Sequence, residues 1–168
     1  MKKILALSSA LILLCGCSAE PEVASPETNR LFSADAVVCT AQTEISATVK
    51  RLGNNMWCAE ITAPESLAGI TLNYSADEIT ATYHGMSFTL DKENAPQANL
   101  LGAIFDAIDD SALLTEMPCD SEDGVMTFSG QNELGTYEIV TDADGNLSAV
   151  NLTDEDITVD FSDFVVIT

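Results

Sequence analysis

The sequence predicts a mainly antiparallel β domain with one helix. Apolar and polar residues alternate with period two over most of the chain after residue 31, and turn residues separate these runs. A single segment has the apolar spacing of an amphipathic helix. The length of 168 residues, with 46% hydrophobic and 20% charged residues, suits one globular domain better than two.

The stretch from Ala63 to Leu90 has the clearest strand pattern. Two alternating runs flank a four-residue loop at 75–78, and a third run follows Gly85. A hairpin with this loop collects the larger side chains on one face, whereas a slip of one residue would scatter them over both faces. The side chains on this face are Ile70, Leu72, Tyr74, Ile79, Ala81 and Tyr83.

Three strands are expected before this stretch, at residues 32–41, 43–51 and 56–63. A short loop at 53–55 pairs the second strand with the third and again gathers the apolar residues on one face. Trp57 then lies near Arg51. We expect Trp57 to pack in the core, and stacking on a ligand is the alternative.

Residues 98–110 predict the main helix. Their apolar residues recur with the stripe of an amphipathic helix: Leu100, Leu101, Ile104, Phe105 and Ile108. We expect the helix to pack on a sheet face, and a movable lid over a cavity is the alternative. Acidic residues oppose the dipole at a helix C-terminus, so Asp109 and Asp110 are expected near its end. Residues 112–117 are expected to add at most one further helical turn.

The C-terminal part predicts four more strands, at residues 125–129, 136–141, 147–152 and 157–167. Asp142–Asn146 has the composition of a hairpin turn. The alternation shifts by one residue near Ser162, which indicates a β-bulge.

The N-terminus has the layout of a secretory signal, with Lys2 and Lys3 before an apolar run that is far shorter than a membrane span. The four residues that end at Cys17 resemble the bacterial lipobox. This resemblance implies cleavage after residue 16 and a diacylglycerol thioether, with or without an N-acyl (palmitate-type) chain, on Cys17. A metal-ligand pair or a disulfide of Cys15 and Cys17 is the alternative. No other cofactor is expected.

The predicted organisation is a signal peptide at 1–16, a lipidated cysteine and flexible tether at 17–31, and one domain at 32–168. The tether is rich in Pro, Glu, Ser and Ala and has little to bury. Loss of Lys2 and Lys3 changes the formal net charge from −21 to −23, which argues against a nucleic-acid partner. We expect export and lipid anchoring to the outer face of the cell membrane, or to the periplasmic face of an envelope membrane.

The order of elements then invites a family comparison. The strands of residues 32–62 precede the segment Pro64–Gly69, the turn Tyr83-His84-Gly85, a strand with Phe88, a helix and an acidic hairpin. This order resembles LolA-like and LolB-like lipoproteins, most closely the Gram-positive clostridial type that includes spore germination lipoproteins. The resemblance implies a strongly curved antiparallel sheet, a half-open barrel with the helix on its concave side. In Gram-negative carriers that concavity holds acyl chains.

Two features depart from the carriers. The soluble carrier has no lipobox, and no basic residue here aligns with the arginine of its cavity; Arg51 is the one arginine on a predicted strand. We therefore expect a non-catalytic envelope lipoprotein that binds an apolar ligand, such as a lipid or an acyl chain. The alternative is a docking or regulatory module for a cell-wall enzyme. The expected lining residues are Ile70, Leu72, Tyr74, Ile79, Tyr83, Leu101, Ile104, Phe105 and Trp57.

Other reactive residues are expected to be structural. Cys39, Cys58 and Cys119 are an odd number with no zinc-site spacing, and whether Cys119 pairs with Cys58, with Cys39 or with neither stays open. His84 is the sole histidine and has no catalytic motif around it, so no enzyme activity is expected. The acidic cluster from Asp106 to Asp123 is expected to be a solvated surface, with weak calcium binding as the alternative.

Overall fold

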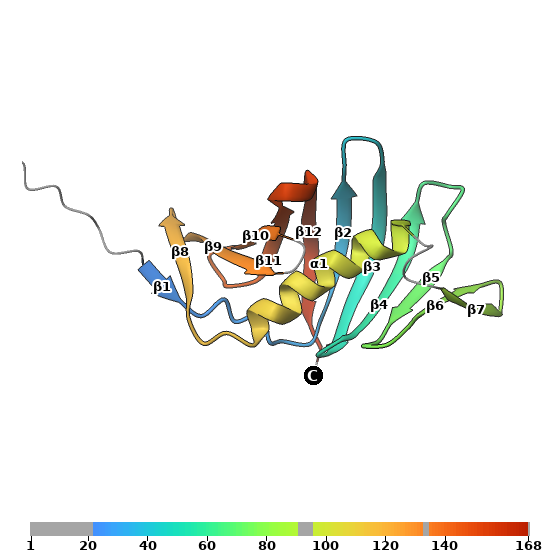
Figure 1. The fold of residues 1–168 in the computed structure, drawn as a ribbon, viewed down its shortest axis with the longest axis horizontal. Coiled ribbons are helices and arrows are strands. Elements are labelled where there is room, and N and C mark those ends of the chain that lie inside the picture. The colour runs from blue at the N-terminus through green and yellow to red at the C-terminus, as the bar shows by residue number, and fades with distance from the viewer. Residues whose placement is uncertain (1–21, 91–95, 133–134, 168) are drawn as a thin grey trace, which may run out of the picture.

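The computed structural model describes residues 22–90, 96–132 and 135–167, and in these residues twelve strands form one antiparallel sheet (Figure 1). The spatial order of the strands is β1-β8-β9-β10-β11-β12-β2-β3-β4-β5-β6-β7. The strands are β1 (Glu22–Ala24), β2 (Phe32–Cys39), β3 (Glu44–Gly53), β4 (Met56–Ala63), β5 (Thr71–Tyr74), β6 (Ile79–Tyr83), β7 (Met86–Leu90), β8 (Met117–Glu122), β9 (Val125–Asn132), β10 (Gly135–Thr141), β11 (Leu147–Leu152) and β12 (Ile157–Val166). The helices are α1 (Pro96–Ala112) and a short 3₁₀ turn, η2 (Thr153–Glu155).

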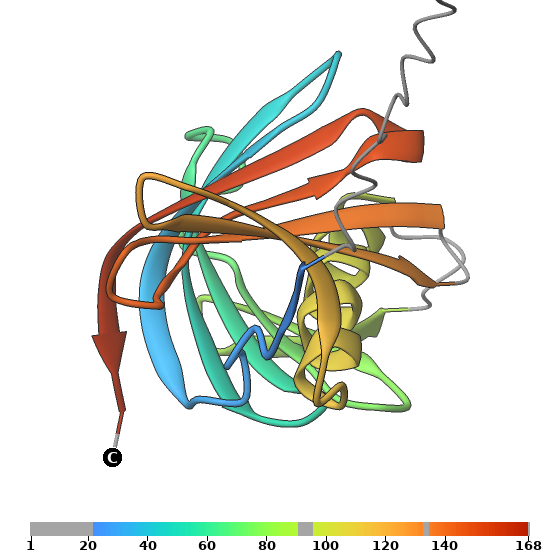
Figure 2. The ribbon, with the colours of Figure 1, turned by 90° about the vertical axis from the view of Figure 1, so that its left-hand side faces the viewer.

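The sheet curves strongly and does not close, because β1 and β7 form its two separate edges. Helix α1 lies across the concave side, as Figure 2 shows. The predicted fold class, a mainly β half-open barrel with one main helix on its concave side, is confirmed. Within the described residues, no helix has both the length and the apolar character needed to cross a membrane.

The predicted strand register is also confirmed. Val49 pairs with Ala59 between β3 and β4, and Tyr74 pairs with Ile79 between β5 and β6. The expected bulge interrupts the pairing of β12 with β2 between Ser162 and Val165. A register fixed in this way places alternate residues of neighbouring strands on the concave face.

Helix α1 packs flush on that face. The buried members of its apolar stripe are Leu101, Ile104, Phe105, Ala107 and Ile108, each no more than 2% exposed. Burial of a large apolar side chain contributes about 1.5–3 kcal/mol, so this contact is a main source of stability. The helix begins two residues before the predicted range and ends two residues after it.

The N-terminal segment corrects the predicted tether. Residues 22–30 fall in the range expected to be flexible, yet β1 pairs with β8 through three residue pairs. Thr28 is 7% exposed, and its hydroxyl lies 2.8 Å from the Ser111 hydroxyl at the end of α1. Composition misses this order because backbone hydrogen bonds to a neighbouring edge, not apolar burial, hold the strand. The described residues 22–31, which were assigned to the tether, are therefore ordered against the domain.

Strand β8 is a second correction, because a further helical turn was expected up to residue 117. Met117 and Cys119 are buried while Pro118 and Asp120 are exposed, which is the period of a strand. The alternation covers too few residues to stand out in the sequence. It becomes a strand because β9 and β1 pair with it on both sides.

Candidate functional site

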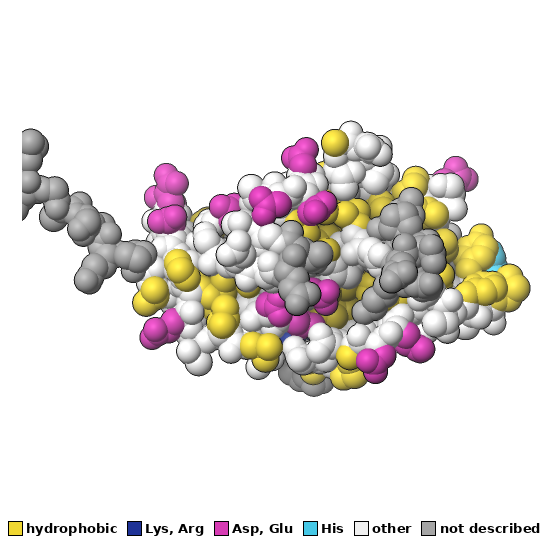
Figure 3. Space-filling model, in the orientation of Figure 1, with side chains coloured by type: hydrophobic (Ala, Val, Ile, Leu, Met, Phe, Trp, Pro, Cys, Tyr) yellow, Lys and Arg dark blue, Asp and Glu magenta, His cyan; other side chains and the backbone are white. Residues whose placement is uncertain are grey.

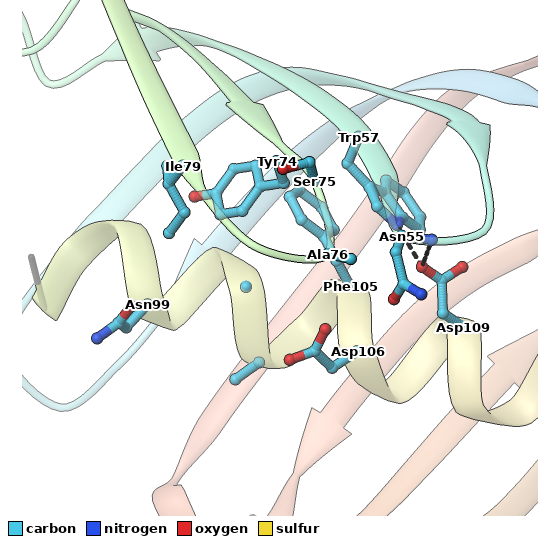
Figure 4. Close-up of a pocket in the computed structure, with 12 residues that line it drawn as sticks. Asn55, Trp57, Tyr74, Ser75, Ala76, Ile79, Asn99, Phe105, Asp106 and Asp109 are labelled. Atoms are coloured by element: carbon cyan, nitrogen blue, oxygen red, sulfur yellow. Dashed lines mark hydrogen bonds between the residues drawn. The ribbon is translucent and has the colours of Figure 1, made fainter. Parts of the chain in front are cut away.

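A cavity of about 250 Å³ lies between α1 and the nearby ends of β4, β5 and β6 (Figure 4). Its apolar wall consists of Trp57, Tyr74, Ile79 and Phe105. Polar side chains also line it: Asn55, Ser75, Asn99 and Asp106. The volume is slightly below the range of about 300–1,000 Å³ that is typical of small-molecule pockets. A short alkyl group fits such a space, whereas a long acyl chain needs α1 to move.

Small residues of α1 create this space. Gly102 and Ala103 lie where the helix passes β5, and a Cβ atom at Gly102 would be 3.6 Å from Cε1 of Tyr74. The neighbouring turns of the helix carry Leu101 and Phe105, which fill the interface with the sheet. The helix thus packs closely on the sheet along most of its length and leaves a space beside Gly102.

Three aromatic rings of the wall contact one another. The Trp57 and Phe105 rings stack with their centroids 4.3 Å apart and their planes 7° apart. The Tyr74 ring meets Phe105 edge to face at 4.9 Å. Burial raises the pKa of the Tyr74 hydroxyl well above its ordinary value, so Tyr74 stays a neutral phenol at physiological pH.

A buried carboxylate joins the helix to this wall. Oδ2 of Asp109 accepts hydrogen bonds from the Trp57 indole nitrogen and from the Asn55 backbone nitrogen, each at 2.8 Å (Figure 4). Oδ1 of Asp109 accepts from Nε of Arg51 at 2.9 Å, and Nη2 of Arg51 makes an ion-pair contact with it at 2.8 Å. Because these partners come from β3, the following turn and β4, the last turn of α1 is fixed on the sheet.

Arg51 also binds the N-terminal segment. Its Nη1 donates to the Arg30 carbonyl oxygen at 3.2 Å and to the Asn29 side chain at 3.4 Å. Its guanidinium lies 5.9 Å from the centre of the Trp57 ring, within the range of a cation–π contact. Arg51 is 1% exposed, so its charge interacts with groups inside the protein and is not accessible to a ligand.

The structure separates the predicted lining residues into three groups. Trp57, Tyr74, Ile79 and Phe105 line the cavity. Leu72, Leu101 and Ile104 are buried core residues, and Ile70 is half-buried against that core. Tyr83 is 41% exposed at the β6–β7 hairpin. Cys17 lies outside the described residues.

Sequence reasoning missed Asn55 and Asp109. Asp109 was expected to be a solvated acid at the helix end, and that expectation is wrong because Arg51 neutralises it in the interior. The available signal was its position in the stripe: Asp109 follows Phe105 by four residues, so both lie on the same helix face.

The other reactive residues lie apart from the cavity. The described cysteines, Cys39, Cys58 and Cys119, are all free. Burial raises the pKa of the Cys58 and Cys119 thiols. His84 lies in the β6–β7 turn with a positive φ of 49°. Among the described residues, no group of three or more His, Cys, Asp or Glu side chains is arranged to hold a metal ion.

Comparisons with known proteins give structural likenesses only. No family model matches the chain, and no curated protein matches it. An uncharacterized conserved protein from Thermus thermophilus has a TM-score of 0.47 at 11% identity, over 83% of this chain and 80% of its own. The LolA superfamily protein NE2245 from Nitrosomonas europaea has a TM-score of 0.43 at 10% identity, over 86% of this chain and 90% of its own.

A DUF1329 family protein from Desulfovibrio piger has a TM-score of 0.41 at 8% identity, over 84% of this chain and 87% of its own. Structural neighbours of this chain thus include LolA superfamily and DUF1329 proteins. The functional arguments below rest on the residues of this chain.

Proposed function

We propose that this protein is a non-catalytic, lipid-anchored envelope protein that binds a small apolar ligand with an uncharged polar end. The observation that carries the proposal is the cavity between α1 and the sheet, with its aromatic wall and polar rim. Apolar walls with a few placed polar groups are the usual composition of small-molecule sites. The ligand class is that of neutral amphiphiles with a short alkyl chain, such as a monoacylglycerol.

The charges around the cavity argue against an anionic head group. The described basic residues are Arg30, Lys50 and Arg51. Arg51 is buried against Asp109, Arg30 pairs with Glu27, and Lys50 is exposed on the opposite face of β3. Asp106 stands at the rim, where it would repel a carboxylate or phosphate. A neutral head group that donates hydrogen bonds suits this rim better.

Trp57 provides a direct assay, because it is the one tryptophan of the chain and lines the cavity. Titration with glyceryl monodecanoate should change the Trp57 fluorescence, and the change should reach saturation. Decanoate has the same ten-carbon chain with an anionic head, and we expect it to bind at least about tenfold more weakly, a difference of about 1.4 kcal/mol. Equal binding of both would contradict the charge argument. If neither compound changes the fluorescence, the proposed binding of a small apolar ligand is wrong.

Two matched substitutions of alanine by phenylalanine test where the ligand binds. Ala76 and Ala41 are both exposed turn residues, but only Ala76 lines the cavity. Ala76→Phe should weaken binding of glyceryl monodecanoate, because the ring occupies the cavity mouth, while Ala41→Phe should leave it unchanged. Equal effects of the two variants would place the ligand elsewhere.

The anchor is a separate part of the proposal. Lipidation at Cys17 would hold the domain on the outer face of the cell membrane, or on the periplasmic face of an envelope membrane, through acyl chains. Cys17→Ala should release the domain or leave an uncleaved precursor. A processed Cys17→Ala protein that stays in the membrane fraction would overturn the anchor without affecting the ligand proposal.

A docking or regulatory module for a cell-wall enzyme is the second candidate. The observation in its favour is the flush packing of α1, because Leu101, Ile104 and Phe105 already cover much of the concave face without a ligand. Affinity capture from solubilised membranes distinguishes the two functions. Recovery of one specific enzyme with no lipid would favour docking, and co-purifying apolar molecules without that enzyme would favour ligand binding.

A further inference from the structure

We infer that two copies of this chain associate through the free edges of their β7 strands. In the sheet order β7 is the last strand, and none of the described strands pairs with its outer side. The outer side of an edge strand presents unpaired backbone groups that can bind another strand. The opposite edge of the sheet is β1, which pairs with β8 and is only three residues long.

The β6–β7 hairpin carries an exposed apolar surface. The exposed fractions are 41% for Tyr83, 56% for Met86 and 53% for Phe88. Figure 3 shows a group of hydrophobic side chains, in yellow, beside the sole histidine, in cyan, at one end of the molecule. The pairing of β7 with β6 is regular, with no bulge, and β7 contains neither lysine nor proline. Three common protections of an edge strand, a bulge, a lysine and a proline, are therefore missing from β7.

The hairpin register shows which backbone groups are free. His84 and Gly85 both have positive φ, as in a two-residue type I′ turn, so Tyr83 and Met86 form a hydrogen-bonded pair. Hydrogen-bonded and non-hydrogen-bonded pairs alternate along antiparallel strands. Met86, Phe88 and Leu90 therefore bond to β6. Ser87 and Thr89 direct their N–H and C=O groups to the open edge.

This spacing is self-complementary under a two-fold axis. If Ser87 pairs with Thr89 of the second copy, and Thr89 with its Ser87, four backbone hydrogen bonds form. Phe88 then lies directly opposite Phe88 of the second copy as the non-hydrogen-bonded pair, where side chains are closest. Both apolar faces continue on the same side of the joined sheet. Such an isologous contact closes on itself and gives a dimer rather than a fibre.

Charge indicates a second copy rather than an unrelated strand. The 27 acidic residues give the chain a formal net charge of −21, so most surfaces of two copies repel each other. The hairpin from Ile79 to Leu90 contains none of these acids and no lysine or arginine. It is the uncharged end at which two acidic molecules can meet.

Disulfide trapping tests the inference on the full chain, in membranes and after purification. Cys39, Cys58 and Cys119 are first replaced by serine. Phe88→Cys should then form a covalent dimer on mild oxidation, because the Cα separation of a non-hydrogen-bonded pair suits a disulfide. Met56→Cys is the matched control, since Met56 is 50% exposed on another hairpin, and it should not crosslink. Equal crosslinking by both variants would overturn the inference.

A second variant separates edge pairing from chance contact. Thr89→Pro removes an outward N–H group that β6 does not use, so the domain should keep its circular dichroism spectrum and urea midpoint. In the Phe88→Cys background it should reduce crosslinking to the level of Met56→Cys. Undiminished crosslinking would exclude pairing through β7. A crosslink to a different protein in membranes, with none between purified copies, would show that the edge binds a foreign strand and would also overturn the inference.

Discussion

Arg51 of β3 and Asp109 of α1 form a buried ion pair with a nitrogen–oxygen distance of 2.8 Å, and their side chains are 1% and 6% exposed. The pair joins the helix end to the middle of the sheet. Removal of one partner from such a pair leaves an uncompensated charge in the interior, which costs more than the intact pair contributes.

Asp109→Asn should therefore reduce the free energy of unfolding by about 3–5 kcal/mol. The adjacent Asp110 is exposed and bonds only weakly, with the Asn132 amide at 3.3 Å, so Asp110→Asn should change stability by less than about 0.5 kcal/mol. Urea unfolding measures both variants. Similar midpoints for the two would mean that the buried pair does not hold α1 on the sheet.

Gly102→Ala and Gly85→Ala should have opposite effects on stability. A methyl group at Gly102 makes an ordinary contact with Tyr74 and removes a glycine from the helix interior, a gain of about 0.5–1 kcal/mol. Gly85 has open space around it but a φ of +79°, so alanine there should cost about 1–2 kcal/mol. Thermal unfolding compares them, and a loss of stability in Gly102→Ala would show that the helix and Tyr74 lie closer together than described.

Gly130→Ala should destabilise the protein by about 1–3 kcal/mol, because the new Cβ would clash with Cζ of the buried Tyr137. The ring faces β9 across the pair Tyr137–Gly130, so either the ring or the strand must shift. Ser129→Ala, one residue away and exposed, is the control and should be nearly neutral. A neutral Gly130→Ala would mean that Tyr137 has room to move.

Asp142 should make stability depend on pH. The backbone N–H of Asn146 donates to its carboxylate at 2.8 Å, and this bond, with others in the turn, lowers the pKa of Asp142. A lowered folded-state pKa gives stability that is present above the unfolded pKa of about 3.9 and is lost as pH falls through the folded value. Asp142→Asn should thus lower the melting temperature at pH 6, and its difference from the wild type should shrink as the pH falls below about 3.9. A difference that is constant with pH would contradict this.

Much of the fold follows from the sequence because the signals are local. Alternation in the β5 and β6 segments and the turn at Asp142 determine strand faces and register without reference to the rest of the chain. The stripe that contains Ile104 likewise predicts α1. These predictions are confirmed since each depends on residues a few positions apart.

The predictions that were wrong concern residues whose structure depends on partners far away in the sequence. Strand β1 exists because β8 offers an edge much later in the chain, and Asp109 is buried because Arg51, 58 positions earlier, reaches it. The cavity was predicted only in part. Trp57, Tyr74, Ile79 and Phe105 were named, but the hollow beside Gly102 depends on how closely helix and sheet approach.

Strand β1 also has a mechanical consequence. In the anchored protein that we propose, any pull between membrane and domain reaches β1 before every other strand. Only three residue pairs join it to β8 at the sheet edge, so few backbone hydrogen bonds resist its detachment. Release of residues 22–28 would add about 23 Å of chain at about 3.3 Å per residue. The first strand is then a force-dependent extension of the tether, and Arg51, bound to the backbone of Arg30, is where the extension stops.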